Sequence, residues 1–319
     1  MSFSKEVKEE LARQLELARH CQIAEIAAII NMNGKVLISE TGNYRLQIQT
    51  ENEGVARKCF TLLEKAFNIE AEIAVKKSSY LKKSNVYIVA IKNHQEALKI
   101  LQATKLLNAD NQIDENISLV SNTIIQMSCC KRAFVRGAFL AAGSISAPEK
   151  FYHLEIVCTV AKKAEKLQSI IKSLGIEAKV VARKKYFVVY IKEGAMIVEM
   201  LALMGANVAL MDLENVRILK EMRNNVNRKV NCETANINKT VSAAVKQIED
   251  IRYIEETIGF SNLALGLQAI ATVRLEYPDA TLKELGEMLT PAVGKSGVNH
   301  RLRKLQNIAD DIRANKKEI

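Results

Sequence analysis

Residues 135–143 read Val-Arg-Gly-Ala-Phe-Leu-Ala-Ala-Gly and run directly into Ser144-Ile-Ser146. Small residues along such a segment let a helix lie close to a partner helix, and a terminal glycine ends the helix and releases a strand. A second stretch, 26–34, reads Ile-Ala-Ala-Ile-Ile-Asn-Met-Asn-Gly and continues into Lys35-Val-Leu-Ile-Ser39. The two stretches predict a pair of closely packed, glycine-terminated helices.

Matching segments follow both helices in the same order: a Tyr-x-Leu-x-Ile strand, an amphipathic helix, an Ile-Glu-Ala segment and a hairpin ending in Ile-Lys. The matched pairs are 44–48 with 152–156, 59–66 with 167–174, 69–71 with 176–178, and 87–92 with 187–192. Ordered matches of this kind indicate an internal repeat. Residues 1–205 are therefore predicted to form two α/β half-domains, each a helix, two strands, a helix, two strands and a helix.

The two glycine-terminated stretches resemble the paired LAGLIDADG helices of homing endonucleases. In those enzymes an acidic residue just before the final glycine of each helix holds a divalent metal ion, which requires oxygen ligands. The matching residues here are Asn33 and Ala142, and the upstream acidic position carries Asn31 and Leu140. Alanine has no ligand atom, and a neutral asparagine cannot offset the charge of a dication. The resemblance predicts the frame of a nuclease without its metal centre.

Basic residues cluster at the tips of the two predicted hairpins, in 76–83 and 182–186. In homing endonucleases the sheets form a saddle that grips DNA, which makes these tips candidates for phosphate contact. Lysine-rich hairpin ends also serve merely to prevent edge pairing of strands, and the sequence leaves both interpretations open. The candidate secondary phosphate contacts are Lys76, Lys77, Lys82, Lys83, Arg183, Lys184 and Lys185.

The chain has 319 residues, an apolar content of 48% and a formal net charge of +10. The apolar content excludes a disordered chain. The positive net charge favours a polyanionic partner, and the alternative is that the charge is spread over the surface and serves solubility. The charged N-terminal segment, in which Ser4 is predicted to cap a helix, has no signal-peptide core, and no segment has the apolar length of a membrane span. We expect a cytoplasmic protein without membrane contact.

The six cysteines contain no Cys-x-x-Cys pair. Cys129-Cys130 lies in helical surroundings, where buried thiols are expected. His20-Cys21 is the only His/Cys neighbour pair, and it lacks a companion pair to complete a zinc site. The sequence therefore predicts no metal site and no cofactor.

Residues 206–245 are predicted to form a linker region. The run 224–231 reads Asn-Asn-Val-Asn-Arg-Lys-Val-Asn, and asparagine is a poor helix former. We expect no stable helix there, and we expect helical patterning to resume at about Ser242. Residues 246–319 form the predicted C-terminal domain, which is all-α.

Three helices are expected in close order in this C-terminal domain. The first is closed by Tyr-Pro-Asp at 277–279. The second covers 281–289 and opens with the capping box Thr-Leu-Lys-Glu. The third is predicted to be capped by Ser296 and carries one apolar stripe, at Val298, Leu302, Leu305 and Ile308.

Between Lys295 and Gln306 the third helix has four basic residues and no acidic residue. A short helix, a turn and a basic helix are typical of a helix-turn-helix, whose second helix reads base edges in the major groove. An ordinary three-helix bundle with a basic face is the alternative, and the predicted turn is longer than the ~3–4 residues usual for the motif. Asn299 is predicted to contact adenine, and Arg303 and Lys304 to contact phosphate. The candidate DNA-binding residues are Thr281, Lys283, Lys295, Ser296, Asn299, His300, Arg301, Arg303 and Lys304.

A two-repeat LAGLIDADG-like domain without its acids, followed by a helix-turn-helix, resembles the WhiA family of bacterial proteins over nearly the whole chain. The most specific segments are 129–144, 282–289 and 294–305. The resemblance implies a cytoplasmic, nucleoid-associated transcription regulator, tied to sporulation in some lineages and to cell division and chromosome segregation in others.

The predicted fold class is α/β (α+β), a two-repeat LAGLIDADG-like N-terminal domain followed by an all-α helix-turn-helix domain. The favoured function is that of a non-catalytic regulator, with double-stranded DNA as partner and no small-molecule substrate. One alternative is a metal-dependent endonuclease that recruits acids outside the motif, such as Glu25 or Glu40. Another is an architectural or adaptor protein whose N-terminal domain binds another protein.

Overall fold

The computed structural model describes residues 2–40, 42–77, 85–107 and 120–315. The chain divides into two compact units, residues 1–220 and 221–319, which are described separately. Lys82 and Lys83, two of the predicted phosphate contacts, lie outside the described residues.

Unit 1 contains the two predicted repeats, preceded by one additional helix, α1 (Phe3–Arg13). The first repeat comprises α2 (Arg19–Asn33), β1 (Gly34–Ile38), β2 (Tyr44–Thr50), α3 (Glu53–Phe67), β3 (Glu72–Lys77), β4 (Asn85–Ile91) and α4 (His94–Ala103). The second comprises α5 (Ser128–Ala142), β5 (Gly143–Ile145), β6 (Leu154–Cys158), α6 (Ala161–Lys172), β7 (Lys179–Arg183), β8 (Tyr186–Ile191) and α7 (Gly194–Met204). The predicted order of elements in each repeat is confirmed.

The sheets of the two repeats have the same topology. Antiparallel strands run in the order β1-β2-β4-β3 in one sheet and β5-β6-β8-β7 in the other. The register repeats as well, because Ile48 pairs with Val89 and Ile156 pairs with Val189. All four side chains are buried, and α3 and α6 pack on the corresponding strands. Equivalent apolar positions therefore fill the core of each half.

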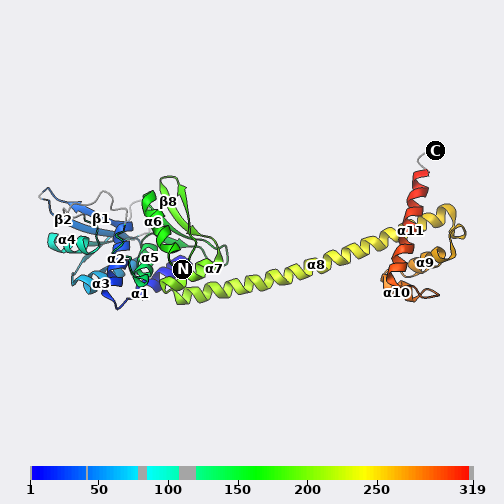
Figure 1. The fold of residues 1–319 in the computed structure, drawn as a ribbon, viewed down its shortest axis with the longest axis horizontal. Helices are drawn as coiled ribbons and strands as arrows, with labels where there is room; N and C mark the ends of the chain where they lie inside the picture. The colour runs from blue at the N-terminus through cyan, green and yellow to red at the C-terminus, as the bar shows by residue number, and fades with distance from the viewer. Residues whose placement is uncertain (1, 41, 78–84, 108–119, 316–319) are drawn as a thin grey trace. The chain divides into compact units, whose positions relative to one another are not determined.

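Helices α2 and α5 form the centre of unit 1, and Figure 1 shows the strands of the two repeats on either side of them. Both helices end at a glycine that begins the next strand. At Gly137 the two backbones nearly touch: a Cβ atom added there would lie 2.3 Å from the carbonyl oxygen of Glu25 and 3.0 Å from the Cβ of Ala28. Since only glycine fits this contact, Gly137 sets the spacing of the helix pair.

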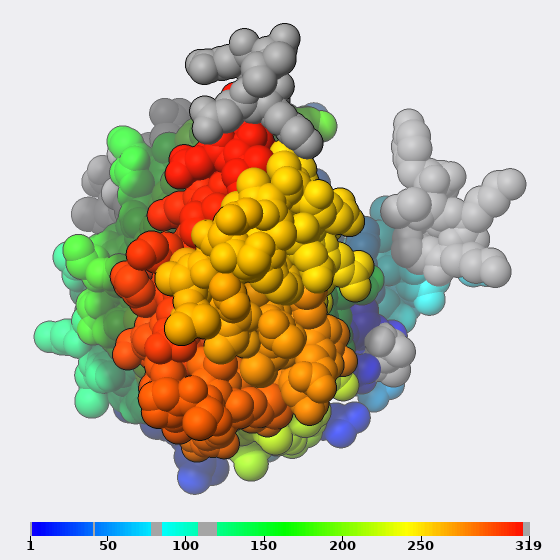
Figure 2. All heavy atoms as spheres, turned by 90° about the vertical axis from the view of Figure 1, so that its right-hand side faces the viewer, coloured from blue at the N-terminus to red at the C-terminus, as the bar shows by residue number. Residues whose placement is uncertain are grey.

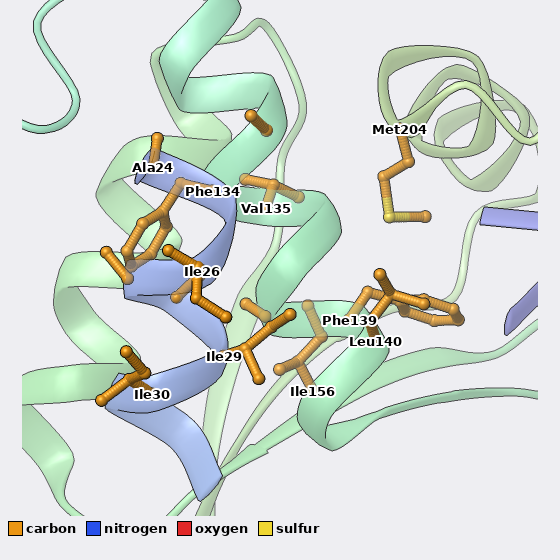
Figure 3. Packing of buried hydrophobic residues seen from close by; sticks show 14 of the residues in the cluster. Ala24, Ile26, Ile29, Ile30, Phe134, Val135, Phe139, Leu140, Ile156 and Met204 are labelled. Carbon is orange, nitrogen blue, oxygen red and sulfur yellow. The ribbon is translucent and has the colours of Figure 1, made fainter. Parts of the chain in front are cut away.

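Apolar side chains from both helices fill the space around this contact, as Figure 3 shows. Ile26 and Ile29 of α2, Phe139 and Leu140 of α5, and Ile156 of β6 are all 0% exposed. Leu140, which stands at an acidic position of the LAGLIDADG motif, is therefore a core residue in this chain.

The start of α1 differs from the prediction. Its N-cap is Ser2, whose hydroxyl accepts a hydrogen bond from the amide of Lys5 at 3.4 Å. The prediction that Ser4 caps the helix is wrong, because Ser4 already lies in the first turn, where its Oγ accepts a hydrogen bond from the amide of Ile145 at 3.3 Å. Both serines precede the buried positions Val7 and Leu11, so their apolar spacing could not show which serine begins the helix.

Helix α1 also caps the helix that follows the two repeats. The carboxylate of Glu10 accepts hydrogen bonds from the amides of Val208 at 2.8 Å and Ala209 at 3.0 Å, in the first turn of α8 (Asn207–Ile258). The side-chain amide of Gln14 donates to the carbonyl of Gly205. A carboxylate in this position satisfies free amides and interacts favourably with the helix dipole. The first helix of the chain thus fixes the start of a helix that lies 198 residues later.

Helix α8 is continuous for 52 residues and includes the predicted linker from Asn207 onward. The prediction that residues 224–231 are not helical is wrong. Asparagine weakens a helix by only about 0.5–0.7 kcal/mol per residue relative to alanine, and extending an existing helix avoids the unfavourable nucleation step. Met222, Val226 and Val230 recur every four residues along it, a spacing that favours a helix. Within the described part of the chain, no helix has the length and apolar character needed to cross a membrane.

Unit 2 packs the end of α8 against three further helices, with a short 3-10 helix, η1 (Phe260–Asn262), after α8. The three helices are α9 (Leu265–Glu276), α10 (Leu282–Glu287) and α11 (Lys295–Asn315). In Figure 2 the spheres of α11 adjoin those of α9 and α10. The predicted stripe of the last helix is confirmed at Val298, Leu302 and Leu305, which are buried, whereas Ile308 is partly buried and Ala309 completes the stripe.

Replacing Gly137 with alanine is expected to destabilise unit 1, because the added methyl group overlaps the carbonyl oxygen of Glu25 and forces the helices apart. Overpacking of this kind costs about 1–3 kcal/mol. Denaturant unfolding measures the effect. The matched control is Gly194→Ala, whose added Cβ meets a ring carbon of Tyr152 at an ordinary 3.4 Å. Equal stability of the two variants would contradict the spacing role of Gly137.

Candidate nucleic-acid interface

Helix α10 begins with the predicted capping box. The hydroxyl of Thr281 accepts a hydrogen bond from the amide of Glu284 at 3.3 Å, and the carboxylate of Glu284 accepts one from the amide of Thr281 at 2.7 Å. The hydrogen bond from the Thr281 backbone, aided by the one from its side chain, lowers the pKa of Glu284. The capping box is confirmed and fixes the start of the helix.

Residues 288–294 join α10 to α11. This turn folds back on α10, because the amide of Val293 donates a hydrogen bond to the carbonyl of Gly286 at 2.9 Å. A Cβ atom added to Gly286 would lie 2.0 Å from the carbonyl oxygen of Val293, so only glycine allows the approach. The turn is longer than is usual in a helix-turn-helix, yet α10 and α11 still pack on each other.

Helix α11 begins at Lys295, so the prediction that Ser296 caps it is wrong. The amide of Val298 donates a hydrogen bond to the carbonyl of Gly294 at 3.1 Å, which places the cap at the glycine. Glycine is an acceptable N-cap. Ser296 lies instead in the first turn, where it is exposed.

The buried stripe of α11 decides which of its side chains face outward. Successive residues of an α-helix are rotated by about 100°, which places His300 and Arg303 away from the stripe. The predicted contacts of α11 that are exposed are Lys295, Ser296, His300, Arg303 and Lys304. We call these residues, together with Asn299, the outer face of α11.

An open hollow of about 510 Å³ is lined by residues of α10 and α11, namely Leu282, Lys295, Ser296 and Asn299. Asn299 is half-buried there. The hollow brings together an ammonium, a hydroxyl and an amide group, all of which can hydrogen-bond to DNA. On α10, Thr281 and Lys283 are exposed, and the Nζ of Lys283 lies 3.8 Å from a carboxylate oxygen of Glu287.

Arg301 is separated from the outer face. It lies two residues after Asn299, and a rotation of about 200° puts the two side chains on opposite flanks of the buried stripe. Arg301 is half-buried, and its Nη1 donates a hydrogen bond to the carbonyl of Gly266 in α9 at 3.4 Å. The structure therefore joins Arg301 to the packing between α9 and α11 and does not bring it together with Asn299 and Arg303.

The described basic residues of the two hairpins are all exposed: Lys76, Lys77, Arg183, Lys184 and Lys185. Lys184 adopts a left-handed conformation, with φ of 55°, in the turn between β7 and β8. Arg183 lies 3.9 Å from a carboxylate oxygen of Glu155. Since β3 and β7 are edge strands, the exposed lysines fit protection of a strand edge as well as phosphate contact.

The last turns of α2 and α5 contain no acidic residue. The side-chain amide of Asn33 donates a hydrogen bond to the carbonyl of Ala141 at 2.9 Å, and the Nζ of Lys163 donates to the carbonyl of Asn31 at 2.5 Å. Two donors therefore occupy two of the backbone oxygens at these ends, and the side chain of Ala142 offers no ligand atom. This arrangement is opposite to the anionic oxygens that hold a dication.

A cavity of about 1110 Å³ opens at the same ends. The charged residues that line it are Glu9, Glu51, Glu53, Lys5, Lys8, Lys35 and Lys163. Burial lowers the pKa of Lys8 to about 8, and the charge of Glu51 opposes this shift. Neither Glu25 nor Glu40, the two acids named in the nuclease alternative, lines the cavity.

Glu25 is instead the centre of a buried ionic network between the repeats. Its Oε1 lies 3.1 Å from the Nζ of Lys58, and both of its oxygens accept hydrogen bonds from Arg136 at 3.1 Å. Arg136 also donates to the carbonyl of Met204 at 3.1 Å and to Glu16 at 3.0 Å. Burial lowers the pKa of Lys58. With both oxygens held by cations, Glu25 is unsuited to bind a metal ion.

A second polar cluster was not predicted. At the N-terminal ends of α2 and α5, the fold brings His20 and Cys21 together with Cys129 and Cys130. Burial, followed by the neighbouring Cys129 thiol, raises the pKa of Cys21 to about 12, and burial raises the pKa of Cys130. The sequence showed both pairs but gave His20-Cys21 no companion. The repeat offset, which aligns the ends of the two helices, was the signal that could have joined them.

Family models match most of the chain. The WhiA N-terminal LAGLIDADG-like domain matches residues 19–107, the WhiA LAGLIDADG-like domain matches 131–223, and the WhiA C-terminal HTH domain matches 226–309. The chain belongs to the WhiA family. The resemblance seen in the sequence and the predicted fold class are thereby confirmed.

WhiA relatives match nearly the full length of the chain. A probable cell division protein WhiA from Lachnoclostridium phytofermentans is 55% identical over 98% of this chain and 100% of its own length. One from Clostridium beijerinckii is 47% identical over 99% and 100%, respectively. The crystal structure of full-length WhiA from Thermatoga maritima has a TM-score of 0.58 and 25% identity, and the match covers 98% of this chain and 99% of that one.

Replacing Glu25 with glutamine is expected to destabilise unit 1 by about 3–5 kcal/mol, because it leaves Lys58 and Arg136 buried without their shared counter-charge. Chemical denaturation measures the loss. The control is Glu53→Gln, which removes the exposed partner of Arg57, where a surface pair contributes ~1 kcal/mol or less. If both variants unfold at the same denaturant concentration, the network does not hold the repeats together.

Proposed function

We propose that this WhiA-family chain is a non-catalytic transcription regulator that binds double-stranded DNA by placing α11 in the major groove. The observation that carries the proposal is the outer face of α11, which is exposed except at the half-buried Asn299, in a segment that has no acidic residue from Lys295 to Gln306. Its buried stripe holds it against α9 and α10. A rigidly mounted helix with amide, imidazole and guanidinium groups suits direct readout of base edges. The match to the family's HTH domain supports this proposal.

The residues of the outer face have separate roles in the proposal. Asn299, near the start of α11 and beside the hollow, reads a base edge, for which adenine is the best partner of a side-chain amide. Arg303 and Lys304, further along and exposed, contact phosphate. Lys295 and Ser296, with Thr281 and Lys283 of α10, fix the register on the backbone. Arg301 supports α11 from the side of α9.

Unit 1 contributes less to sequence recognition in this proposal. Its exposed hairpin residues, Lys76 and Lys77 in one repeat and Arg183 to Lys185 in the other, add phosphate contacts without reading bases. The same unit offers a surface for a protein partner of the regulator. The names of the curated relatives support a role in cell division. We extend it to chromosome segregation, with sporulation in some lineages and association with the nucleoid.

Asn299→Ala and Arg303→Ala are expected to weaken DNA binding in different ways. The first removes a base contact, costs about 1–3 kcal/mol and relaxes specificity at one position. The second weakens binding to all sequences alike and reduces the salt slope by about one. The measurement is the affinity of the full chain for a site found by genomic footprinting and for random DNA, across a salt series.

Arg301→Ala is the matched control, since it removes the same charge from the opposite flank of the same helix. It should change the affinity and the salt slope less than Arg303→Ala does. If Asn299→Ala and Arg303→Ala bind DNA like the unmodified chain, α11 is not the reader. A loss confined to variants of Lys184 and Lys185 would then assign the role to the hairpins.

The purified chain is expected not to cleave DNA in the presence of magnesium or manganese, because Asn33 and Ala142 leave the ends of α2 and α5 without carboxylates and donors bind two of the carbonyls there. Incubation with supercoiled plasmid tests this, with a metal-dependent nuclease on the same plasmid as the positive control. Metal-dependent nicking that disappears in Glu51→Gln or Glu53→Gln, two acids that line the cavity, would show that the chain is a nuclease.

A further inference from the structure

Four side chains with metal-binding groups meet at the N-terminal ends of α2 and α5. They are His20, Cys21, Cys129 and Cys130, and their ligand atoms all lie within 4.8 Å of one another. The Nδ1 of His20 is 3.1 Å from the sulfur of Cys130 and 3.3 Å from the sulfur of Cys21. Three of these side chains are buried or half-buried, and His20 closes the cluster from the exposed side.

The two pairs occupy equivalent positions of the internal repeat. Helices α2 and α5 are both 15 residues long, so His20 matches Cys129 and Cys21 matches Cys130, each the second and third residue of its helix. The two pairs are therefore equivalent under the pseudo-twofold symmetry that relates the repeats. The cluster is at the end of the helix pair opposite Asn33 and Ala142, where homing endonucleases hold their metal.

The donor set and its spacing fit zinc. Three thiolates and one imidazole form a recognised set for a structural zinc ion, with Zn–S near 2.3 Å and Zn–N near 2.0–2.1 Å. Tetrahedral geometry with those bond lengths separates the ligand atoms by about 3.5–3.8 Å, so adjustments of ~1 Å or less convert the observed cluster into a coordination shell. Magnesium and calcium prefer oxygen ligands, whereas sulfur and imidazole favour zinc.

The helix termini favour the negative charge of such a site, although burial and the carboxylate of Glu16 disfavour free thiolates there. Three thiolates around a dication leave one net negative charge, and two helix N-termini point at the cluster, which favours negative charge. Neither helix has an acidic residue in its first turn. Lys131 and Arg132 follow Cys130 directly in the chain. A coordinated dication also deprotonates the thiols that bind it.

We propose that His20, Cys21, Cys129 and Cys130 bind one zinc ion in a closed structural site that joins the N-terminal ends of the two repeat helices. All four ligands come from protein, so the site has no open position for substrate and does no chemistry. The ion cross-links residues 109 positions apart and adds its binding free energy to the stability of unit 1. Together with the Glu25 network about one turn further along, it fixes the relative position of the repeats.

The test uses the full chain, purified under reducing conditions, stripped with a chelator and titrated with zinc or cobalt. We expect one metal ion per chain and, with cobalt, the intense visible bands and sulfur-to-metal charge transfer of a tetrahedral thiolate site. Cys130→Ser should lower the zinc affinity by about 100-fold or more, since loss of a second-shell partner alone costs ~10–100-fold. Cys232→Ser, which alters an exposed cysteine of α8 outside the cluster, should bind zinc like the unmodified chain.

A second variant separates weaker zinc binding from loss of the fold. His20 is exposed, so His20→Ala should keep the helical circular dichroism spectrum while it weakens zinc binding and changes the cobalt spectrum. Zinc should raise the thermal midpoint of the chain and of Cys232→Ser but not that of Cys130→Ser. The proposal is overturned if the chain binds no zinc, or if Cys130→Ser and His20→Ala bind it as tightly as the unmodified chain. Isolation of the chain without metal and with a disulfide between Cys21 and Cys130 would likewise overturn it, in favour of a redox pair.

Discussion

The contact of α2 with α5 at Gly137 is the constraint on which unit 1 depends. The backbone of α5 approaches the Glu25 carbonyl this closely, and the carboxylate of the same residue is fully buried, so it needs partners inside the protein. It finds them in Lys58 and Arg136, one from each repeat. Ion pairs in an apolar interior contribute little net free energy to folding, but they require a specific geometry of the charged groups. Glu25 therefore takes part both in the closest backbone approach and in the buried ion pairs between the repeats.

Much of this architecture is readable from the sequence, because a repeat shows each element twice. The order of strands and helices, the glycine ends of α2 and α5, and the capping box at Thr281 all follow from local patterns. Predictions from local patterns were wrong where neighbouring residues determine the structure of a segment. Asparagines in 224–231 became helical because α8 was already helical on both sides, and Ser4 lost the capping role to Ser2 by a shift that the apolar spacing cannot detect.

The candidate sites show the same limit. The sequence shows that Arg301 and Asn299 both lie off the apolar stripe, but only the position of α9 shows that Arg301 is engaged by Gly266. Similarly, His20-Cys21 and Cys129-Cys130 are distant in the chain and meet because two helices start side by side. Residue type can be read from the chain, whereas membership of a cluster depends on how elements pack. At the other end of the same helices, Asn33 and Lys163 donate hydrogen bonds to the backbone carbonyls of Ala141 and Asn31.

The hydrogen bonds from Glu10 to the start of α8 have a consequence for how the chain is made. Helix α1 leaves the ribosome first, but its partners at residues 208 and 209 emerge 198 residues later. At synthesis rates of about 5–20 residues per second, that delay is roughly 10–40 s. During it, α1 can pack first against α3 and then, once residues 128–145 have emerged, against α5 and β5. The carboxylate of Glu10 meanwhile has no partner from α8. Completion of the N-terminal unit during translation thus awaits the second repeat, and a ribosome that stalls between the repeats presents a half-formed domain to the chaperones of the cell.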